Sequence, residues 1–424
     1  MARAQAEQRV DAPGGIHYAW VVVALTFMVL LVAAGVRNAA SVLIKPLELE
    51  FGWTRSQISL AISVSLLTFG LGGPLGGTLI ERWGTRRVML TGLALIALGL
   101  APLTLIRELW QLHLFWGIFA GIGTGMVATV LGATVASRWF KTRRGLVLGL
   151  FSAASSAGQL IFLPVLLQLS STVGWRTAIW TILAAVVALV LPIAIWMRNR
   201  PQDVGLRAVG ELSDDPDPQT GLQKVAMLQV VRTPDFWLLA SSFFICGYTS
   251  NGMIGTHLLP HALEHGFTET VAAGALALMG VMNMVGSLSS GWLTDRYDSR
   301  KLLACYYGFR ALSLGALPWV NTRPMLLVFA VFYGLDWIAT VPPTVALTSK
   351  IYGKAAVGPV FGWIFCAHMF GAALAAYVGG ALYDALQSYN IAFWSSAALG
   401  LIAVALSLRI ARRVLPLNRQ ASVV

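Results

Sequence analysis

Ionisable side chains inside long apolar stretches are the first residues of this sequence that suggest chemistry. Asp336 stands in VFYGLDWIATVPPTVAL, Arg37 follows AWVVVALTFMVLLVAAGV, and His368 stands in WIFCAHMFGAALAAYVGG. A carboxylate can bind and release a proton, a guanidinium can hold an anion, and an imidazole can carry a proton near neutral pH. Together these residue types indicate the handling of protons and of a small anion.

Each of these residues also has a purely structural interpretation. Asp336 could be held by a partner on a neighbouring helix, Arg37 could extend to an aqueous interface, and His368 could be a hydrogen-bonded packing residue. Asn251 could line a cavity or form a hydrogen bond between helices, and the same choice applies to Asn283. For Arg310 we favour a structural role.

Two prolines follow Asp336 within the same apolar stretch. Pro342 and Pro343 have no backbone N–H, so they should interrupt a helix locally. The interruption could provide a hinge or free carbonyl groups near Asp336.

The composition indicates that most of the chain lies in lipid. Hydrophobic residues make up 57% of the 424 residues and charged residues only 11%, whereas soluble domains carry roughly 25% charged residues. The net charge of +12 lies in short clusters at the ends of apolar runs, which argues against a nucleic-acid partner. We therefore expect a lipid bilayer to surround the protein.

The apolar runs predict an all-α integral membrane protein with twelve transmembrane helices. A spanning helix needs about 20 mostly apolar residues, and backbone groups in lipid must be satisfied within the helix. The expected spans cover about residues 18–44, 57–80, 88–106, 111–137, 144–172, 177–197, 235–260, 270–293, 302–320, 325–349, 357–382 and 390–411. The first run is too long for the core of a signal peptide, so we expect it to be retained.

The distribution of lysine and arginine predicts the orientation. With the N-terminus in the cytoplasm, most of the 30 basic residues fall in cytoplasmic segments, as the positive-inside rule requires. The connections on the other side hold only Lys45, Arg55, Arg107, Arg176 and Arg323. We expect a multi-pass protein of the inner (plasma) membrane with both termini in the cytoplasm.

Two stretches of charged sequence repeat each other. GGTLIERWGTRRVML at 76–90 resembles SGWLTDRYDSRKLLA at 290–304, and matching residues are separated by the same interval, about half of the chain. The repeat predicts two pseudo-symmetric halves related by an axis along the membrane normal. We expect a cytoplasmic tail, a six-helix bundle, a cytoplasmic linker, a second six-helix bundle and a cytoplasmic tail, at residues 1–17, 18–197, 198–234, 235–411 and 412–424. A short surface helix is expected at 221–231.

The repeated stretch resembles the loop motif of the major facilitator superfamily. The first copy matches the motif at Gly77, Glu81, Arg82, Gly84, Arg86 and Arg87, and the second copy has Gly291, Asp295, Arg296 and Arg300, with Asp298 in place of the second glycine. The resemblance implies a secondary transporter whose halves rock around a central cavity. We expect the loop charges to contact helix ends across the halves and to stabilise one conformation.

Three further stretches resemble the monocarboxylate porters and the oxalate/formate antiporter group. They are YAWVVVALTF with SVLIKPLELEFGWTRSQIS, WFKTRRGLVLGLFSAASSAG and RTPDFWLL. The resemblance implies a small-molecule substrate that is an organic anion, for example a monocarboxylate, moved together with protons. Members of the group often place a substrate-binding arginine where this chain has Ser287, which we count among the candidate residues.

Other activities find less support in the sequence. A proton-driven exporter of drugs or amphipathic compounds is the alternative within transport. An integral-membrane enzyme is disfavoured because HExxH, GxSxG and paired catalytic acids are missing. No metal site is expected from the three scattered cysteines, or from His257, His261 and His265, because no carboxylate or cysteine completes a ligand set. We expect no cofactor and a monomeric protein.

Overall fold

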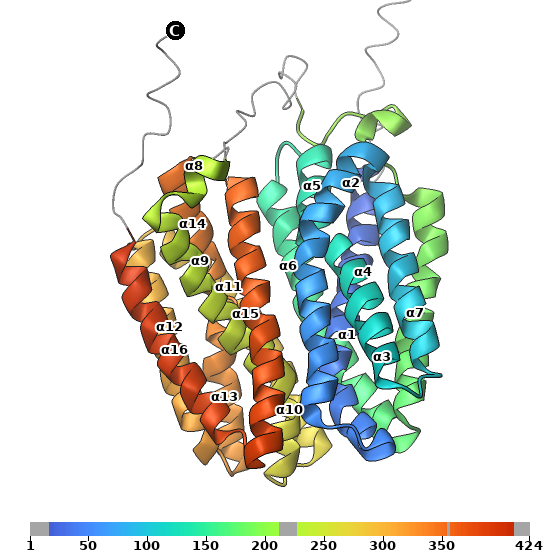
Figure 1. The fold of residues 1–424 in the computed structure, drawn as a ribbon. Helices are drawn as coiled ribbons and strands as arrows, with labels where there is room; N and C mark the ends of the chain where they lie inside the picture. The colour runs from blue at the N-terminus through green and yellow to red at the C-terminus, as the bar shows by residue number, and fades with distance from the viewer. Residues whose placement is uncertain (1–16, 212–226, 354–356, 411–424) are drawn as a thin grey trace, which may run out of the picture.

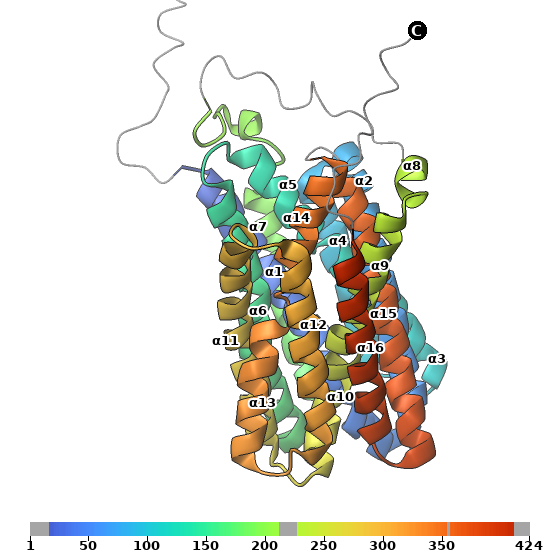
Figure 2. The same cartoon turned by 90° about the vertical axis from the view of Figure 1, so that its left-hand side faces the viewer.

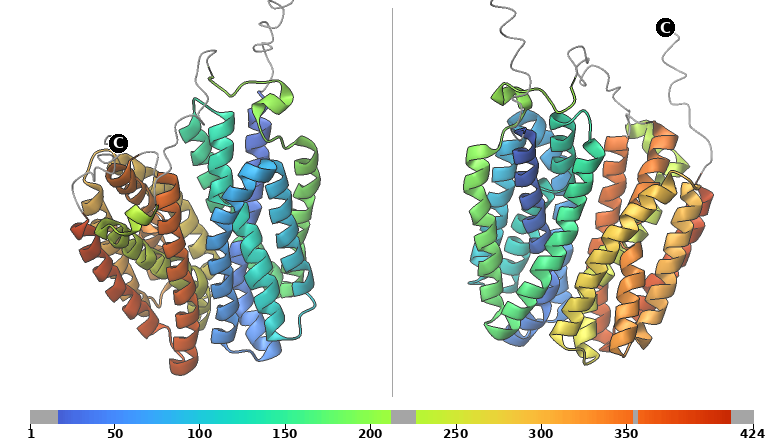
Figure 3. Two further views of the ribbon diagram at one scale, coloured as in Figure 1. Left: turned by 45° about the horizontal axis from the view of Figure 1, so that its top comes forward. Right: turned by 180° about the vertical axis from the view of Figure 1, so that it is seen from behind.

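The computed structural model describes residues 17–211, 227–353 and 357–410. The chain forms two helical bundles that lie side by side (Figure 1). Figure 3 shows the same two bundles with the viewpoint tipped and from behind. Helix α1 begins, and helix α16 ends, at the same face of the molecule (Figure 1). We call this face the terminal face and the other one the opposite face.

The N-terminal bundle is built from long helices joined by short connections. Its elements are α1 (Ala19–Phe51), α2 (Arg55–Leu103), α3 (Leu109–Leu112), the π-helix η1 (His113–Ala120), α4 (Gly121–Met126), α5 (Thr129–Trp139), α6 (Arg144–Thr172) and α7 (Trp175–Trp196). Helices α3 to α5 together with η1 form one interrupted rod and correspond to the fourth expected span.

The C-terminal bundle contains more interruptions. After the short 3₁₀ turn η2 (Pro201–Val204), its elements are α8 (Met227–Val231), α9 (Pro234–Gly247), the π-helix η3 (Tyr248–Ile254), α10 (Gly255–Glu264), α11 (Glu269–Thr294), α12 (Ser299–Ala316), the turn η4 (Leu317–Trp319), α13 (Arg323–Asp336), α14 (Val341–Tyr352), α15 (Val357–Leu386) and α16 (Asn390–Arg409).

All twelve expected spans correspond to helical rods. Within the described part of the chain, nine helical stretches are long and apolar enough to cross a membrane. One of them, α2, contains two expected spans. The remaining two are the seventh span, which η3 divides, and the ninth, α12, which carries Arg300, Lys301 and Arg310. The prediction of a twelve-helix, all-α membrane protein is confirmed.

Helix α1 extends seven residues beyond the predicted end of the first span. Charged residues beyond this end are paired in the structure. Lys45 Nζ lies 3.6 Å from Glu48 Oε2, and Arg176 Nη2 lies 2.6 Å from Glu50 Oε1. Because these charges face partners at the aqueous end of the bundle, the helix continues through them.

The tenth span is interrupted where the two prolines predicted it. Helix α13 ends at Asp336, α14 begins at Val341, and Pro342 and Pro343 occupy the first turn of α14. A proline in the first helical turn removes an N–H that has no intrahelical acceptor, so it is tolerated there. Figure 2 shows α13 and α14 following one another along the same rod, next to α12.

Two parts of the predicted organisation lie wholly or partly outside the described residues. Residues 1–16 and 412–424 of the expected tails are among them. The surface helix expected at 221–231 is seen as α8 over Met227–Val231, and residues 221–226 are not described. Residues 198–211 of the linker pack against the N-terminal bundle, where the Val209 N–H donates to the Trp139 carbonyl over 2.9 Å.

Candidate functional site between the two bundles

A buried ion pair connects Asp336 with Arg310. Arg310 in α12 has 0% of its surface exposed and Asp336 has 4%. The Nε of Arg310 donates to Oδ2 of Asp336 over 2.7 Å. The second oxygen of Asp336, Oδ1, is buried and has no hydrogen-bond partner in the structure. An unsatisfied buried oxygen costs about 1–3 kcal/mol, and a proton placed on it would remove the carboxylate charge.

Arg310 also binds two carbonyl groups at the helix break. Its Nη2 donates to the carbonyl oxygens of Asp336 (2.7 Å) and Trp337 (3.1 Å), and its Nη1 donates to Cys246 Sγ in α9 (3.0 Å). From the sequence we favoured a structural role for Arg310. The long side chain reaches from α12 to α9 and to the break, so it is part of the site around Asp336.

Asn251 and His368 lie together beside the break. Asn251 belongs to the π-helix η3, and π-helical turns are frequent at functional sites. Its Nδ2 lies 3.4 Å from Nε2 of His368 in α15, and its Oδ1 lies 3.3 Å from Nε1 of Trp337. The Nδ1 of His368 lies 3.1 Å from the carbonyl oxygen of Phe243. The structure therefore groups Asp336, Asn251 and His368 in the C-terminal bundle.

Arg37 faces this group from the N-terminal bundle. Its guanidinium carbon lies 4.7 Å from the ring centroid of Phe69 in α2, and that ring is 6.3 Å from the ring of Phe365 in α15. Phe365 in turn stacks on His368, with centroids 5.7 Å apart. A row of aromatic rings thus links Arg37 to His368 across the two bundles.

Asn283 and Ser287 occupy a separate contact between the bundles. Both lie on α11, and Ser287 Oγ is 3.5 Å from Asn283 Oδ1. The Nδ2 of Asn283 is 3.4 Å from Oγ of Ser156 in α6. These distances describe weak polar contacts between helices, and the structure does not join Asn283 or Ser287 to the group around His368.

At the opposite face, Arg55 joins the two bundles, which sequence reasoning did not foresee. Arg55 begins α2 and is 1% exposed. Its Nη2 contacts Glu48 in α1 at 3.2 Å and also contacts Glu264 at the end of α10. Its Nη1 donates to the hydroxyl oxygen of Tyr389 over 2.9 Å, and its guanidinium carbon lies 3.7 Å from the ring centroid of Tyr383. Burial raises the pKa of the Tyr389 hydroxyl, which keeps it neutral.

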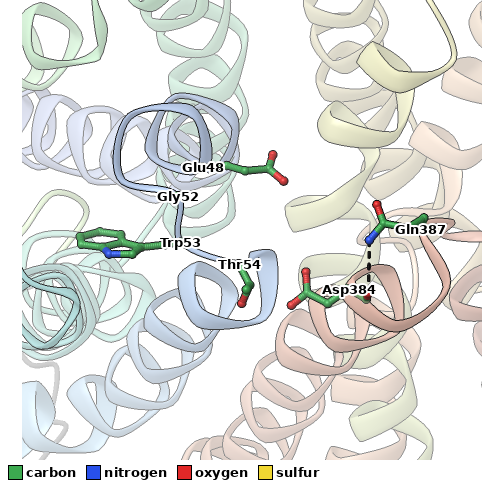
Figure 4. Close-up of a pocket in the computed structure, with 6 residues that line it drawn as sticks. All are labelled: Glu48, Gly52, Trp53, Thr54, Asp384 and Gln387. Atoms are coloured by element: carbon green, nitrogen blue, oxygen red, sulfur yellow. Dashed lines mark hydrogen bonds between the residues drawn. The ribbon is translucent and has the colours of Figure 1, made fainter.

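Asp384 strengthens this junction by binding the start of α2. Its carboxylate accepts from the backbone N–H groups of Arg55 (3.1 Å) and Ser56 (2.9 Å), where the helix dipole favours a negative charge. Figure 4 shows Glu48, Thr54 and Asp384 around a pocket of about 370 Å³ between α1, α2 and the end of α15. We call Arg55, Glu48, Glu264, Asp384 and Tyr389 the latch.

The surroundings of glycine residues differ between the two faces. A Cβ added to Gly380, near the latch, would collide with Ser59 and the Arg55 carbonyl. A Cβ added to Gly358 or Gly362, at the other end of α15, would meet no atom within 4 Å. Gly380 therefore allows α15 to pack closely against the start of α2, whereas Gly358 and Gly362 border open space.

The two copies of the loop motif adopt different backbone conformations. Gly84 bends α2 with φ 83° and ψ 164°, a left-handed φ that favours glycine. Asn199, after α7, accepts from the backbone N–H of Arg86 with its Oδ1 over 2.9 Å. In the second copy Asp298 has φ −63° and caps α12 by accepting from the Arg300 N–H. The second copy needs no glycine because the chain is stabilised there by a helix cap.

The contacts of the motif arginines stay within each bundle. Arg86 donates to the Ala194 carbonyl of α7. Arg300 pairs with Asp298 at 2.6 Å and donates to the Ile410 carbonyl at the end of α16. The prediction of contacts across the halves is thus wrong for Arg86 and Arg300, because both side chains bind helix ends of their own bundle. The other motif charges, Glu81, Arg82, Arg87, Asp295 and Arg296, are exposed near the terminal face, and the motif glycines Gly77 and Gly291 are partly buried.

Replacing Gly84 with alanine should destabilise the protein by about 1–3 kcal/mol, because the new Cβ is strained at this φ and would overlap the Asn199 side chain. Thermal unfolding of the purified variant measures the effect. Gly291→Ala is the matched control, since a Cβ there meets nothing within 4 Å. Equal unfolding temperatures for both variants would contradict this account of Gly84.

No metal centre is evident in the part of the chain that the structure describes. No group of three histidine, cysteine, aspartate or glutamate side chains there could hold a metal ion. His257 and His261 are buried against the ring of Tyr389, and His265 packs on His261 with ring centroids 4.0 Å apart.

Two membrane-embedded bundles with polar groups at their interface define a secondary transporter. The chain belongs to the Major Facilitator Superfamily, which matches residues 25–335 and 246–422. This family consists of transporters and not enzymes, and the resemblance noted in the loop motif is confirmed. The protein is a multi-pass membrane protein that carries a small-molecule substrate.

Curated relatives support the same assignment. An uncharacterized MFS-type transporter of Bacillus subtilis, YcxA, is 27% identical over 381 residues, with 87% of this chain and 90% of the relative covered. Monocarboxylate transporter 11 of Mus musculus is 29% identical over 389 residues, covering 89% and 83%. Among solved structures, a D-xylose–proton symporter superposes with a TM-score of 0.76 at 12% identity, over 93% of this chain and 98% of that chain, which supports the fold.

Proposed function

We propose that the protein transports a small organic anion, in the first place a monocarboxylate, together with a proton. The observation that carries the proposal is the situation of Arg37. The buried arginines Arg55, Arg300 and Arg310 each have a carboxylate within 3.2 Å, whereas in the described residues Arg37 contacts the ring of Phe69 and has no such partner. A partly buried guanidinium without an anion is a natural binding point for a substrate carboxylate.

The proton site in this proposal is Asp336. In the empty carrier Asp336 is ionised and paired with Arg310. A proton that binds the unpartnered Oδ1 neutralises the carboxylate and weakens its ion pair with Arg310. This alters the interactions that Arg310 makes at the break between α13 and α14. The anion then occupies the region between Arg37 and His368, so that one proton and one anion move together without net charge.

The structure supports the inward-facing state for this cycle. With both termini in the cytoplasm of a cell whose inner membrane contains the protein, the latch closes the external side. The end of α15 that carries Gly358 and Gly362 then faces the cytoplasm. Alternating access follows if the bundles separate at the latch and approach each other at the terminal face. We take a single chain to be sufficient for this cycle.

Replacing Arg37 with glutamine should weaken anion binding by roughly 10- to 100-fold, because a hydrogen bond to a charged group contributes about 1.5–3 kcal/mol. The measurement is a thermal-shift titration of the purified protein with a series of monocarboxylates and their uncharged amides, since a ligand of the folded state raises the unfolding temperature. Wild-type protein should respond to carboxylates and not to amides.

Arg107→Gln provides the control, because Arg107 is an exposed arginine on a connection at the opposite face. This variant should bind as the wild type does. The proposal fails if amides stabilise the protein as well as the acids do, or if Arg37→Gln retains full affinity. A response to hydrophobic cations instead would favour the drug exporter.

A further inference from the structure

A chain of hydrogen bonds runs from the α13–α14 break to the carbonyl of Phe243. It begins at Trp337, the first residue after α13, continues through Asn251 in η3, and reaches His368 in α15. Three elements of the C-terminal bundle therefore meet in a single polar path. Asp336 directly precedes Trp337, so the path starts beside the proposed proton site.

The chemistry of the side chains fixes the direction of every bond in this chain. An indole N–H can only donate, so the Oδ1 of Asn251 accepts from Trp337. The amide Nδ2 of Asn251 must then donate, and Nε2 of His368 must accept. Because Nε2 accepts, the ring proton of neutral His368 lies on Nδ1, which donates to the Phe243 carbonyl.

A second proton on His368 is incompatible with this arrangement. Protonated Nε2 would face the Nδ2 donor of Asn251. If the amide of Asn251 rotated to offer its oxygen to His368, its NH₂ group would face the N–H of Trp337. Either way one bond of the chain is replaced by two opposed donors. Protonation of His368 and the bond to Trp337 therefore exclude each other.

Charged and titratable groups surround this imidazole from the neighbouring elements. Cys246 of α9 interacts with His368 directly, and Arg310 of α12 donates to the same thiol. Asp336 ends α13 beside Trp337, and Arg37 of α1 lies behind the rings of Phe69 and Phe365. Asp336 is itself paired with Arg310.

We propose that Trp337 and Asn251 are positioning residues that hold His368 as a neutral hydrogen-bond acceptor, and that movement at the α13–α14 break releases His368 to bind a second proton. Only the part that protonation of His368 would play in transport rests on the proposed function. The bond pattern itself can be tested without any substrate.

The test is the titration of ¹⁵N-labelled histidine in the full-length protein in lipid bilayers, followed by solid-state NMR. The chain has six histidines, and a His368→Gln sample identifies the His368 signals by difference. In wild-type protein His368 should show its proton on Nδ1. In Trp337→Phe, which keeps an aromatic ring but loses the donor, Asn251 can rotate, and protonation should begin about 0.5 to 1 pH unit higher.

Trp363→Phe is the matched control on α15, where the indole is 59% exposed, and it should titrate as the wild type does. Asn251→Ser removes the Nδ2 donor and should shift the titration in the same direction, which keeps the test valid if Trp337→Phe does not fold. A proton on Nε2 in wild-type protein, or unchanged titration in both site variants, would overturn the inference. Failure of the carboxylate-binding titration alone would refute the proposed substrate and leave this result unaffected.

Discussion

Replacing Arg55 with alanine should shift the protein toward a conformation that is open at the opposite face. The change leaves Glu264 without its arginine and Glu48 with Lys45 alone, 3.6 Å away, and it removes the donor to Tyr389. Because the two carboxylates are 27% and 24% exposed, solvent reduces the loss below that of a fully buried pair. We expect roughly 1–3 kcal/mol, which is about a 5- to 150-fold change in the balance of states.

Labelling of a single cysteine at Ser59 measures this shift. Ser59 is completely buried beneath Gly380, so in a background without the native cysteines a membrane-impermeant maleimide should react slowly with Ser59→Cys and much faster once Arg55 is replaced. Arg176→Ala is the control, since Arg176 forms its ion pair with Glu50 inside the N-terminal bundle. If both arginine variants label equally, Arg55 does not hold the bundles together.

Replacing Asp336 with asparagine should abolish uptake driven by a proton gradient while exchange of substrate across the membrane continues. Asparagine has the same shape and can still accept a hydrogen bond from Arg310, but it cannot bind and release a proton. For one-to-one coupling, accumulation amounts to roughly tenfold per pH unit of gradient, and it should fall to about onefold in the variant. Proteoliposomes loaded with substrate measure both activities.

Glu269→Gln is a suitable control because it removes an exposed carboxylate at the start of α11. It should accumulate substrate as the wild type does. Accumulation against a gradient by Asp336→Asn would show that another group carries the proton. Loss of both exchange and accumulation, together with a lower unfolding temperature, would assign Asp336 a structural role.

The helices and their boundaries were largely predictable because lipid imposes a simple length and composition on each span. The break after Asp336 was also predictable, since Pro342 and Pro343 cannot continue a helix. The π-helical turn that carries Asn251 was not, because no residue type marks such a turn. The end of α1 was misplaced because the pairing of Glu50 with Arg176, 126 residues away, cannot be read from local sequence.

The candidate site was predicted as single residues and not as a set of contacts. Asp336 and His368 were recognisable because polar groups in apolar runs are rare. Their partners were harder to find, since Arg310 is 26 residues from Asp336 and an extended arginine side chain can reach several neighbouring helices. Arg55 was counted only as a charge on a connection, and its contacts with Glu264 and Tyr389 depend on how the bundles dock.

The different turns at Gly84 and Asp298 affect how the two repeats can move. In the first repeat the chain turns at Gly84, which has a left-handed φ, and is held by a hydrogen bond to Asn199. In the second repeat it turns at Asp298, which caps α12 and pairs with Arg300. Segments that descend from the same pattern therefore have unequal stiffness. The two repeats therefore need not move equally during rocking. If segments 76–90 and 290–304 were exchanged, Gly84 would enter a bundle that does not contain Asn199.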